Sequence, residues 1–169
     1  MQTLYRLIAS GFGSGYSSVA PGTVGSITCF LGWMLVHIFL PLTWGITLVL
    51  ALFVSVLGMI CTQECLKEEL KHQDTSLQTH LDPSWIVIDE WAGLLFALVL
   101  STPQSLPNAI GALLLFRFFD IKKPGVIGKM EALGGATGIM ADDILAGIFA
   151  LLSLEGILWL WSTLIAGAL

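Results

Sequence analysis

Residues 91–116 read WAGLLFALVLSTPQSLPNAIGALLLF and contain no Asp, Glu, Lys or Arg. Charged residues are also absent from Leu7–Gln63, and Glu155 alone interrupts Ile144–Leu169. About a quarter of the residues in a soluble domain are charged, whereas this chain of 169 residues has 11% charged residues and a mean hydropathy of +0.87. The composition therefore predicts an integral membrane protein.

Several apolar stretches approach the length of about 17 to 25 residues that crosses a bilayer as a helix. An apolar segment in lipid satisfies its backbone hydrogen bonds by becoming helical. Between two of these stretches, the charges of the polar segment Thr62–Pro83 are spaced for ion pairs on a helix, which predicts a short cytoplasmic connector helix. We therefore expect an all-α fold, a polytopic membrane helix bundle of about five spans in one domain over residues 1–169. The predicted spans are Thr23–Leu40, Thr43–Cys61, Trp85–Ser101, Asn108–Phe119 and Ile144–Leu169.

The basic residues indicate which side of the membrane the polar segments occupy. With five spans, the segment before the first span, the connector and the segment before the last span share one side. The positive-inside rule places that side in the cytoplasm, and the C-terminus then lies on the other side. A net charge of −5 and a pI near 4.9 leave no basic surface for nucleic acid, so we expect no nucleic-acid partner. The basic residues, all on that side, are Arg6, Lys67, Lys71, Arg117, Lys122, Lys123 and Lys129.

The Cys and His residues do not suggest a catalytic or zinc site. Cys29, Cys61 and Cys65 lie in or beside apolar runs, which favours buried thiols over disulfides or zinc ligands. No HExxH pattern and no Ser-His-Asp arrangement is visible. We therefore look for the chemistry among the carboxylates and the basic residues.

The first polar cluster is a Gly- and Ser-rich stretch, GFGSGYSSVAPGTVGS, at Gly11–Ser26. Thr23 can cap the following helix, and the free N–H groups at a helix N-terminus can bind an anion. The stretch is not a Walker loop, because no Gly-Lys-Ser/Thr follows, and Tyr16 replaces the third glycine of a GxGxxG pattern. The alternative is a flexible entry loop before a capped helix.

Two acidic clusters precede or open apolar segments. DPSWIVIDEWAG carries Asp82, Asp89 and Glu90, and GGATGIMADDILAG carries Asp142 and Asp143. Carboxylates at an apolar helix entrance are costly without a cation or a basic partner. Oxygen ligands select hard cations, Mg²⁺ first and Mn²⁺ as an alternative. The competing interpretation is that these acids complement helix dipoles. Adjacent helical residues point about 100° apart, so Asp89 and Glu90 share a face only at an irregular helix end.

The third cluster, FRFFDIKK at Phe116–Lys123, combines acid and base. Arg117 and Asp120 are three residues apart and share a helix face. Lys123 precedes Pro124, which favours extended backbone and ends the helix there. Basic residues in this position can bind a phosphate, or they can extend to lipid head groups as an interfacial cluster. Acids and bases at several helix ends on one side predict a pocket for a cation and a phosphorylated, membrane-resident molecule.

At these clusters the sequence resembles the phosphatidylglycerophosphatase A family. The family pattern runs GFGSG-x-S-x-x-x-PGT-x-GS, I-V-x-DE, FR-x-x-D-x-x-KP and GG-x-GIM-x-DD-x-x-AG. The chain has GFGSGYSSVAPGTVGS, IVIDE, FRFFDIKKP and GGATGIMADDILAG in the same order. It departs after Pro124, where Gly125-Val126 replaces the expected Trp-Pro, and its fourth motif has one extra residue, Ala136 or Thr137.

The resemblance implies a magnesium-dependent phosphatase that converts the lipid phosphatidylglycerophosphate to phosphatidylglycerol. It also implies a multi-pass protein of the bacterial inner membrane whose active site faces the cytoplasm. Asp82, which lies just before the IVIDE motif, is a further candidate that the resemblance suggests. The resemblance and the pattern of residues together predict metal ligands among Asp89, Glu90, Asp120, Asp142 and Asp143. The predicted catalytic residues are Asp89, Glu90, Arg117, Asp120 and Asp143, and the predicted phosphate-binding residues are Ser14, Thr23, Arg117 and Lys123.

Three other functions are compatible with the residues. A phosphatase for another membrane lipid phosphate, such as a polyprenyl phosphate, would use the same pocket. A small cation-coupled transporter would place charges near the bilayer midplane and show repeat symmetry. A purely structural membrane subunit would not need the carboxylates for chemistry. The sequence predicts no oligomeric state.

Overall fold

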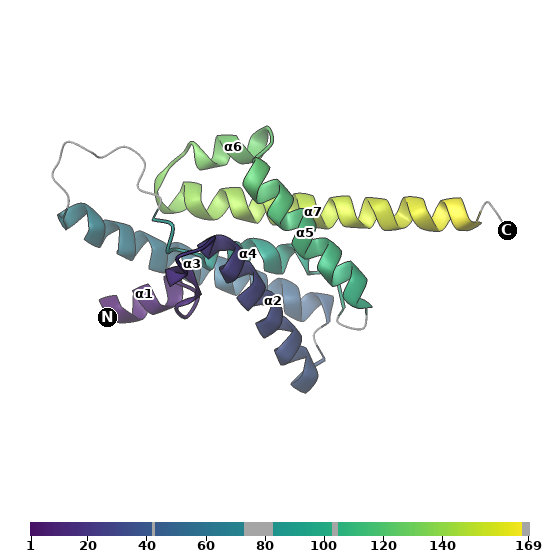
Figure 1. Ribbon diagram of the computed structural model, residues 1–169, viewed down its shortest axis with the longest axis horizontal. Helices are drawn as coiled ribbons and strands as arrows, with labels where there is room; N and C mark the ends of the chain where they lie inside the picture. Colours follow the sequence, from purple (N-terminus) through teal and green to yellow (C-terminus); the bar gives the residue numbers. More distant parts are fainter. Residues whose placement is uncertain (42, 73–82, 103–104, 167–169) are drawn as a thin grey trace.

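The computed structural model describes residues 1–41, 43–72, 83–102 and 105–166. Leu42 of the first predicted turn, Asp82, Pro103 and residues 73–82 of the connector lie outside the described residues. The described part is helical and contains no strand, so the all-α prediction is confirmed (Figure 1). Its elements are α1 (Gln2–Ala9), η1 (Ser14–Tyr16), α2 (Pro21–Phe39), α3 (Trp44–His72), α4 (Ile88–Ala97), α5 (Leu106–Lys122), α6 (Val126–Glu131) and α7 (Gly135–Ala166).

Three of the described helices are long and apolar enough to cross a membrane. They are Pro21–Phe39, Trp44–Lys71 and Gly135–Ala166. These helices indicate a membrane protein, but the predicted number of five spans is not confirmed. Of the other two predicted spans, α4 has 10 residues, well below the length that crosses a bilayer, and α5 has 17, at the lower limit of that length.

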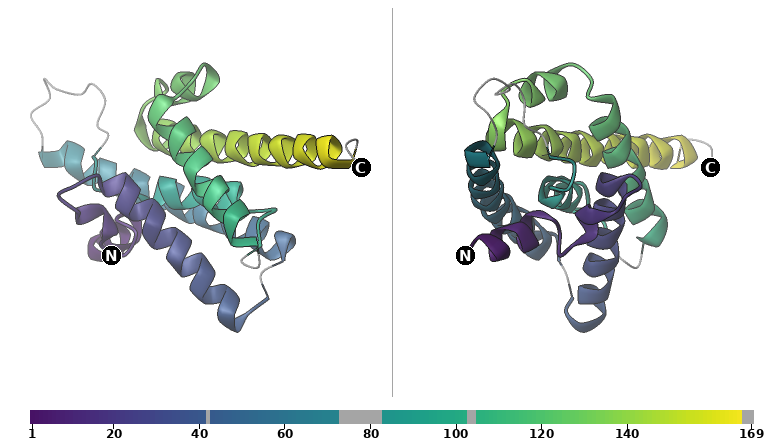
Figure 2. Two further views of the ribbon diagram at one scale, coloured as in Figure 1. Left: turned by 45° about the vertical axis from the view of Figure 1, so that its right-hand side comes forward. Right: turned by 60° about the vertical axis from the view of Figure 1, so that its left-hand side comes forward.

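The apolar residues of helix α4 pack against neighbouring helices, which explains its apolar sequence without a membrane crossing. Its 10 residues extend for about 15 Å, half of the roughly 30 Å hydrocarbon core. It packs against α2, α3, α5 and α7, and seven of its residues are buried (Figure 2). A helix that is apolar on all sides is buried either in lipid or in protein, and sequence alone does not distinguish the two. The predicted span Trp85–Ser101 is therefore a short central helix with irregular ends.

The predicted sidedness does not depend on the number of spans. The start of α4 and the end of α5 both reach the same pocket, described below. The α4–α5 pair therefore leaves and returns on one side, whether or not it reaches the opposite membrane surface. In either case the start of α2, the end of α3 and the start of α7 lie together on that side.

The described first part of the predicted connector, Thr62–His72, is not a separate helix but the end of α3, which corrects the sequence interpretation for these residues. Helix α3 has 29 residues in all, and it continues from the apolar stretch into the polar segment as far as His72. No Gly or Pro occurs between Cys61 and His72, and Glu, Lys and Leu are strong helix formers, so nothing ends the helix at the lipid boundary. One ion pair, Lys67 Nζ to Glu64 Oε1 at 2.6 Å, supports this extension at a spacing of three residues.

Helices α4 and α7 cross at two glycines. A Cβ atom on Gly147 would overlap the backbone carbonyl of Gly93, and one on Gly93 would overlap the carbonyl of Asp143. The pattern D-x-x-A-G occurs in both helices, at residues 89–93 and 143–147. Small residues let helix backbones approach closely. Because each Asp lies one turn before its glycine, the crossing brings Asp89 and Asp143 together.

Candidate active site

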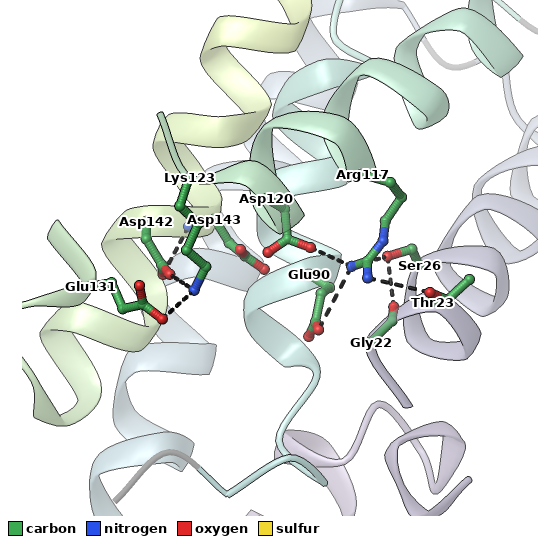
Figure 3. A network of polar contacts seen from close by, with 10 residues as sticks. All are labelled: Gly22, Thr23, Ser26, Glu90, Arg117, Asp120, Lys123, Glu131, Asp142 and Asp143. Atoms are coloured by element: carbon green, nitrogen blue, oxygen red, sulfur yellow. Dashed lines mark hydrogen bonds and ion pairs between the residues drawn. The ribbon is translucent and has the colours of Figure 1, made fainter. Parts of the chain in front are cut away.

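Four helix ends enclose one polar pocket of about 280 Å³. They are the start of α2, the start of α4, the end of α5 and the first part of α7 (Figure 3). The acids and bases predicted from separate motifs therefore lie in a single patch. The predicted site residues that line the pocket are Thr23, Asp89, Glu90, Arg117, Asp120, Lys123, Asp142 and Asp143.

Three carboxylates in this pocket can hold one cation. Asp89, Glu90 and Asp143 each offer an oxygen, and these oxygens lie within 4.8 Å of one another. Asp89 and Glu90 converge although they are adjacent, because both lie in the first turn of α4, where side chains tilt past the N-terminal end.

The donor set fits a hard divalent cation. All three ligands are carboxylates, the ligand type that Mg²⁺ prefers. Asp143 and Asp89 are buried, with 3% and 9% of their surface exposed. Glu90 Oε2 is also buried and has no hydrogen-bond partner in the described part of the chain. A buried carboxylate oxygen without a partner is costly, and a bound cation would remove that cost.

Arg117 connects this acid cluster to α2. Its Nη1 forms an ion pair with Asp120 and lies 3.9 Å from Glu90 Oε1. Nη1 also donates to Ser26 Oγ at 3.4 Å, and Nη2 donates to Thr23 Oγ1 at 3.3 Å. The guanidinium therefore lies between α2, α4 and α5, as Figure 3 shows.

Gly22 allows the close approach between α2 and α4. A Cβ atom at this position would overlap Glu90 Oε1. The carbonyl of Gly22 accepts a hydrogen bond from Ser26 Oγ at 2.8 Å, and the same hydroxyl receives the Arg117 donor. The contact with the Glu90 carboxylate therefore explains why the Pro-Gly-Thr sequence at the start of α2 has a glycine at its centre.

Lys123 binds two carboxylates. Its Nζ lies 2.7 Å from Asp142 Oδ2 and 2.7 Å from Glu131 Oε1. Asp142 Oδ1 accepts the backbone N–H of Asp143 at 3.0 Å, so both Asp142 oxygens are engaged. Asp142 is therefore not part of the carboxylate triad. Burial alone would lower the pKa of Lys123, but the hydrogen bonds to Asp142 and Glu131 outweigh it and raise the pKa.

The backbone at Lys123 differs from the sequence expectation. The helix does end at Lys122, as the following proline predicts. Lys123 itself has φ of 44°, in the left-handed region, where extended backbone was expected. The residue before proline avoids the right-handed helical region, and here the left-handed alternative turns the chain into α6. This turn leads to Glu131 at the end of α6, which binds Lys123.

Burial raises the pKa of Glu90 to about 6. The negative charge of Asp120 acts in the same direction, whereas a hydrogen bond with Asp89 and the charge of Arg117 oppose it. The pocket thus crowds more acidic than basic groups around Glu90.

One of the four predicted phosphate-binding residues, Ser14, lies outside the pocket. Its hydroxyl donates to the carbonyls of Gly11 at 2.9 Å and Ser10 at 3.3 Å within the loop. Lys122, a basic residue of the FRFFDIKK cluster, is exposed and also lies outside the pocket.

Sequence reasoning missed four residues around the site: Gly22, Ser26, Ser84 and Glu131. Gly22 and Ser26 lie inside the first motif, but their contacts depend on helices distant in sequence. Ser84 lines the pocket from the segment before α4. Glu131 lies outside all four motifs. The repeated D-x-x-A-G pattern was a usable signal for the pairing of Asp89 with Asp143.

A model of the family described as Phosphatidylglycerophosphatase A matches residues 7–158. The chain belongs to the phosphatidylglycerophosphatase A family. The resemblance seen in the four motifs is therefore confirmed, and with it the prediction of an enzyme, a phosphatase. The match covers every pocket-lining residue, so the whole pocket lies within the part of the chain that matches the family.

Curated relatives carry two kinds of name. Proteins named "Phosphatidylglycerophosphatase A" from Escherichia coli and Haemophilus influenzae are 33% and 36% identical, over 89% and 87% of this chain and 81% and 84% of their own lengths. A Bacteroides thetaiotaomicron protein named "Putative phosphatidylinositol-3-phosphatase" is 34% identical over 90% of this chain and 92% of its own. No solved structure gave a significant match.

Proposed function

We propose that this chain is a magnesium-dependent phosphatase that hydrolyses phosphatidylglycerophosphate to phosphatidylglycerol and inorganic phosphate. The observation that carries the proposal is one pocket with a carboxylate triad, an arginine and a lysine in a chain of this phosphatase family. The names of the E. coli and H. influenzae relatives support the choice of lipid.

The position of the pocket suits a phosphate at the end of a lipid head group. The pocket lies at the ends of apolar helices, on the side of the bundle that holds the basic residues. The positive-inside rule supports the cytoplasmic side of the bacterial inner membrane for this face. A lipid would place its phosphate in the pocket and keep its acyl chains in the bilayer.

The charge of the pocket requires a cation before an anionic substrate can bind. Five pocket carboxylates face two basic side chains, so a phosphate would meet an excess of negative charge. The chemistry that bound Mg²⁺ supplies is neutralisation of this charge and polarisation of the phosphoryl oxygens. Asp89, Glu90 and Asp143 are the residues that would hold it, because their oxygens already converge.

The remaining polar side chains can carry the hydrolysis. The water oxygen forms a bond to phosphorus while the bond from phosphorus to the head-group oxygen breaks. Arg117 and Lys123 retain N–H donors beyond those used in the pocket, and these can bind the non-bridging oxygens, where charge is concentrated.

Asp120 is the pocket carboxylate that belongs neither to the triad nor to the lysine pair. We assign to it the proton of the attacking water. Asp120 then gives this proton to the departing head-group oxygen, which becomes the hydroxyl of phosphatidylglycerol.

A second substrate is favoured by a specific observation. The B. thetaiotaomicron relative, whose name refers to phosphatidylinositol-3-phosphate, matches 90% of the chain. Both lipids present a phosphate monoester, and the pocket chemistry does not distinguish their alcohol parts. A cation-coupled transporter has less support, because the pocket acids gather on one side of the helix bundle and the chain belongs to a phosphatase family.

The proposal can be tested by phosphate release from purified full-length protein in detergent micelles. Phosphatidylglycerophosphate, phosphatidylinositol-3-phosphate and a polyprenyl phosphate should each be offered with Mg²⁺ and with excess chelator. We expect fastest release from phosphatidylglycerophosphate and none in chelator. Faster release from another lipid would replace the proposed substrate, and full activity in chelator would remove the metal assignment. No release from any of them would contradict the enzyme itself.

A further inference from the structure

Glu155 lies at the centre of the apolar part of α7. It is the one charged residue between Ile144 and Ala166, and it lies eleven positions from each of these ends. Eleven helical residues extend for about 16 Å, which is close to half of the hydrocarbon core. If α7 crosses the bilayer, the Glu155 carboxyl lies near its midplane.

Glu155 has no polar partner among residues 1–41, 43–72, 83–102 and 105–166. In the part of the chain that the structure describes, no hydrogen bond or ion pair involves its side chain. A carboxyl group at the centre of a membrane is costly, and such groups normally face another polar group. What covers Glu155 must therefore be polar: a donor satisfies the ionised carboxylate, and a group with both a donor and an acceptor satisfies the neutral carboxyl.

The helix around Glu155 projects away from its own bundle. Figure 1 shows that the C-terminal part of α7 extends beyond the other helices. Leu154 is the last residue of α7 that is buried against the bundle. Trp159 and Ser162 follow Glu155 by four and seven residues, one and two helical turns, and so share its face, and both are exposed. We call Glu155, Trp159 and Ser162 the Glu155 face.

We propose that the Glu155 face binds the same face of a second copy of this chain, with the two Glu155 carboxyl groups hydrogen-bonded to each other. Two copies inserted in the same orientation place Glu155 at the same depth, so a two-fold axis parallel to α7 brings the groups together. A neutral carboxyl has one donor and an acceptor, which makes the pair self-complementary. Hydrogen bonds of this kind associate helices in lipid.

A second copy explains Glu155 better than the other possible occupants. Lipid chains cannot form hydrogen bonds with a carboxyl. A basic residue at this depth would have to come from another protein, because every Lys and Arg of this chain lies before Leu133, on the pocket side. That foreign partner is one of the outcomes of the test.

The association can be measured with purified protein in phosphatidylcholine vesicles. Two populations of the chain, carrying donor and acceptor fluorophores, are mixed at several protein-to-lipid ratios. We expect energy transfer for the wild type, a dissociation constant about tenfold larger for Glu155→Leu, and near wild-type values for Glu155→Gln, whose amide is also self-complementary. Leu160→Ala, on the opposite face of α7, should behave as the wild type. Phosphate release by each variant shows that it is folded.

Disulfide cross-linking tests the face itself. Ser162→Cys lies two helical turns from Glu155 on the same face, whereas Leu160→Cys points about 140° away. Because the native cysteines Cys29, Cys61 and Cys65 are buried, oxidation should link two Ser162→Cys chains and leave Leu160→Cys monomeric.

Three outcomes would overturn the proposal. They are a purified protein without energy transfer, an unchanged dissociation constant for Glu155→Leu, and equal cross-linking at both positions. Association that occurs in cell membranes but not with the purified chain would assign the Glu155 face to a different membrane protein.

Discussion

Asp142 and Asp143 are adjacent in the chain but have different partners. Asp143 faces Asp89 and Glu90, whereas Asp142 binds Lys123. We expect Asp143→Asn to lower the phosphatase kcat by at least about a thousandfold, because a ligand of the proposed Mg²⁺ would contribute several kcal/mol to the transition state. Asp142→Asn should lower activity about 10- to 100-fold, as loss of a supporting partner does. Phosphate release at a series of Mg²⁺ concentrations measures both. Equal losses for the two variants would contradict the division of roles.

Lys123 and Lys122 form a second pair of neighbours with different surroundings. Lys123→Ala would leave Asp142, which is almost fully buried, without its cation, at a cost of about 3 kcal/mol in the free energy of unfolding. Lys122 is exposed, and Lys122→Ala should change stability by less than about 0.5 kcal/mol. Denaturation in detergent, followed by circular dichroism, compares the two. A similar loss of stability in both variants would mean that the Asp142 contact is not important.

At the scale of single residues, sequence reasoning identified groups that carry charge better than groups that support them. The carboxylates and Arg117 could be selected because a charge beside an apolar segment needs a partner. Glu131 could not, because its contact with Lys123 depends on the left-handed turn that starts α6. Ser14 is the reverse case: its motif suggested an anion site, but its hydroxyl is used by its own loop.

At the scale of helices, the crossing of α4 and α7 holds the acid triad together. A methyl group at Gly147 would overlap the carbonyl of Gly93, so the helices must separate. We expect Gly147→Ala to destabilise the protein by about 1 to 3 kcal/mol, as overpacking does. It should also lower activity at least tenfold, because Asp143 would move away from Asp89.

Gly156→Ala is the matched control on the same helix. A Cβ atom there meets no other atom within 4 Å, and alanine favours a helix over glycine by about 1 kcal/mol. Thermal unfolding and phosphate release should show this variant to be at least as stable as the wild type and fully active. Loss of activity in Gly156→Ala, or an unchanged Gly147→Ala, would contradict the proposed role of the crossing.

The helices show where sequence patterns reach their limit. Apolar length predicted the bounds of α2 to within two residues, because this helix exposes apolar side chains along its length. It also predicted α7 as a long apolar helix, but α7 begins at Gly135, nine residues before the predicted Ile144, because the Gly-rich stretch expected to be a loop is helical. The same rule misjudged α4, whose apolar residues face other helices. It also ended α3 at the lipid boundary, although a helix continues into water wherever the residues favour it. The length of an apolar run indicates how long a segment is kept away from water. It does not show whether protein or lipid excludes the water.

At the scale of the whole molecule, the distribution of basic residues predicts the orientation of the pocket. Every Lys and Arg lies in segments on the pocket side, for three crossings as for five. This prediction is more robust than the number of spans, because it depends on the summed charge of each side and not on helix ends. The orientation of the pocket also determines which leaflet of the bilayer would supply a lipid substrate, because a lipid enters the pocket from the leaflet on the same side.

The orientation can be measured with two single cysteines and a maleimide reagent that does not cross membranes. Lys129→Cys lies in α6 beside the pocket, and Ile165→Cys lies at the far end of α7. In inverted bacterial vesicles, whose cytoplasmic face is outside, the first should react and the second should be protected. Right-side-out vesicles should give the opposite result. The wild type, with its three buried cysteines, is the background control. Labelling of Ile165→Cys in inverted vesicles would place the pocket outside the cytoplasm, and the enzyme would then have to draw its substrate from the outer leaflet.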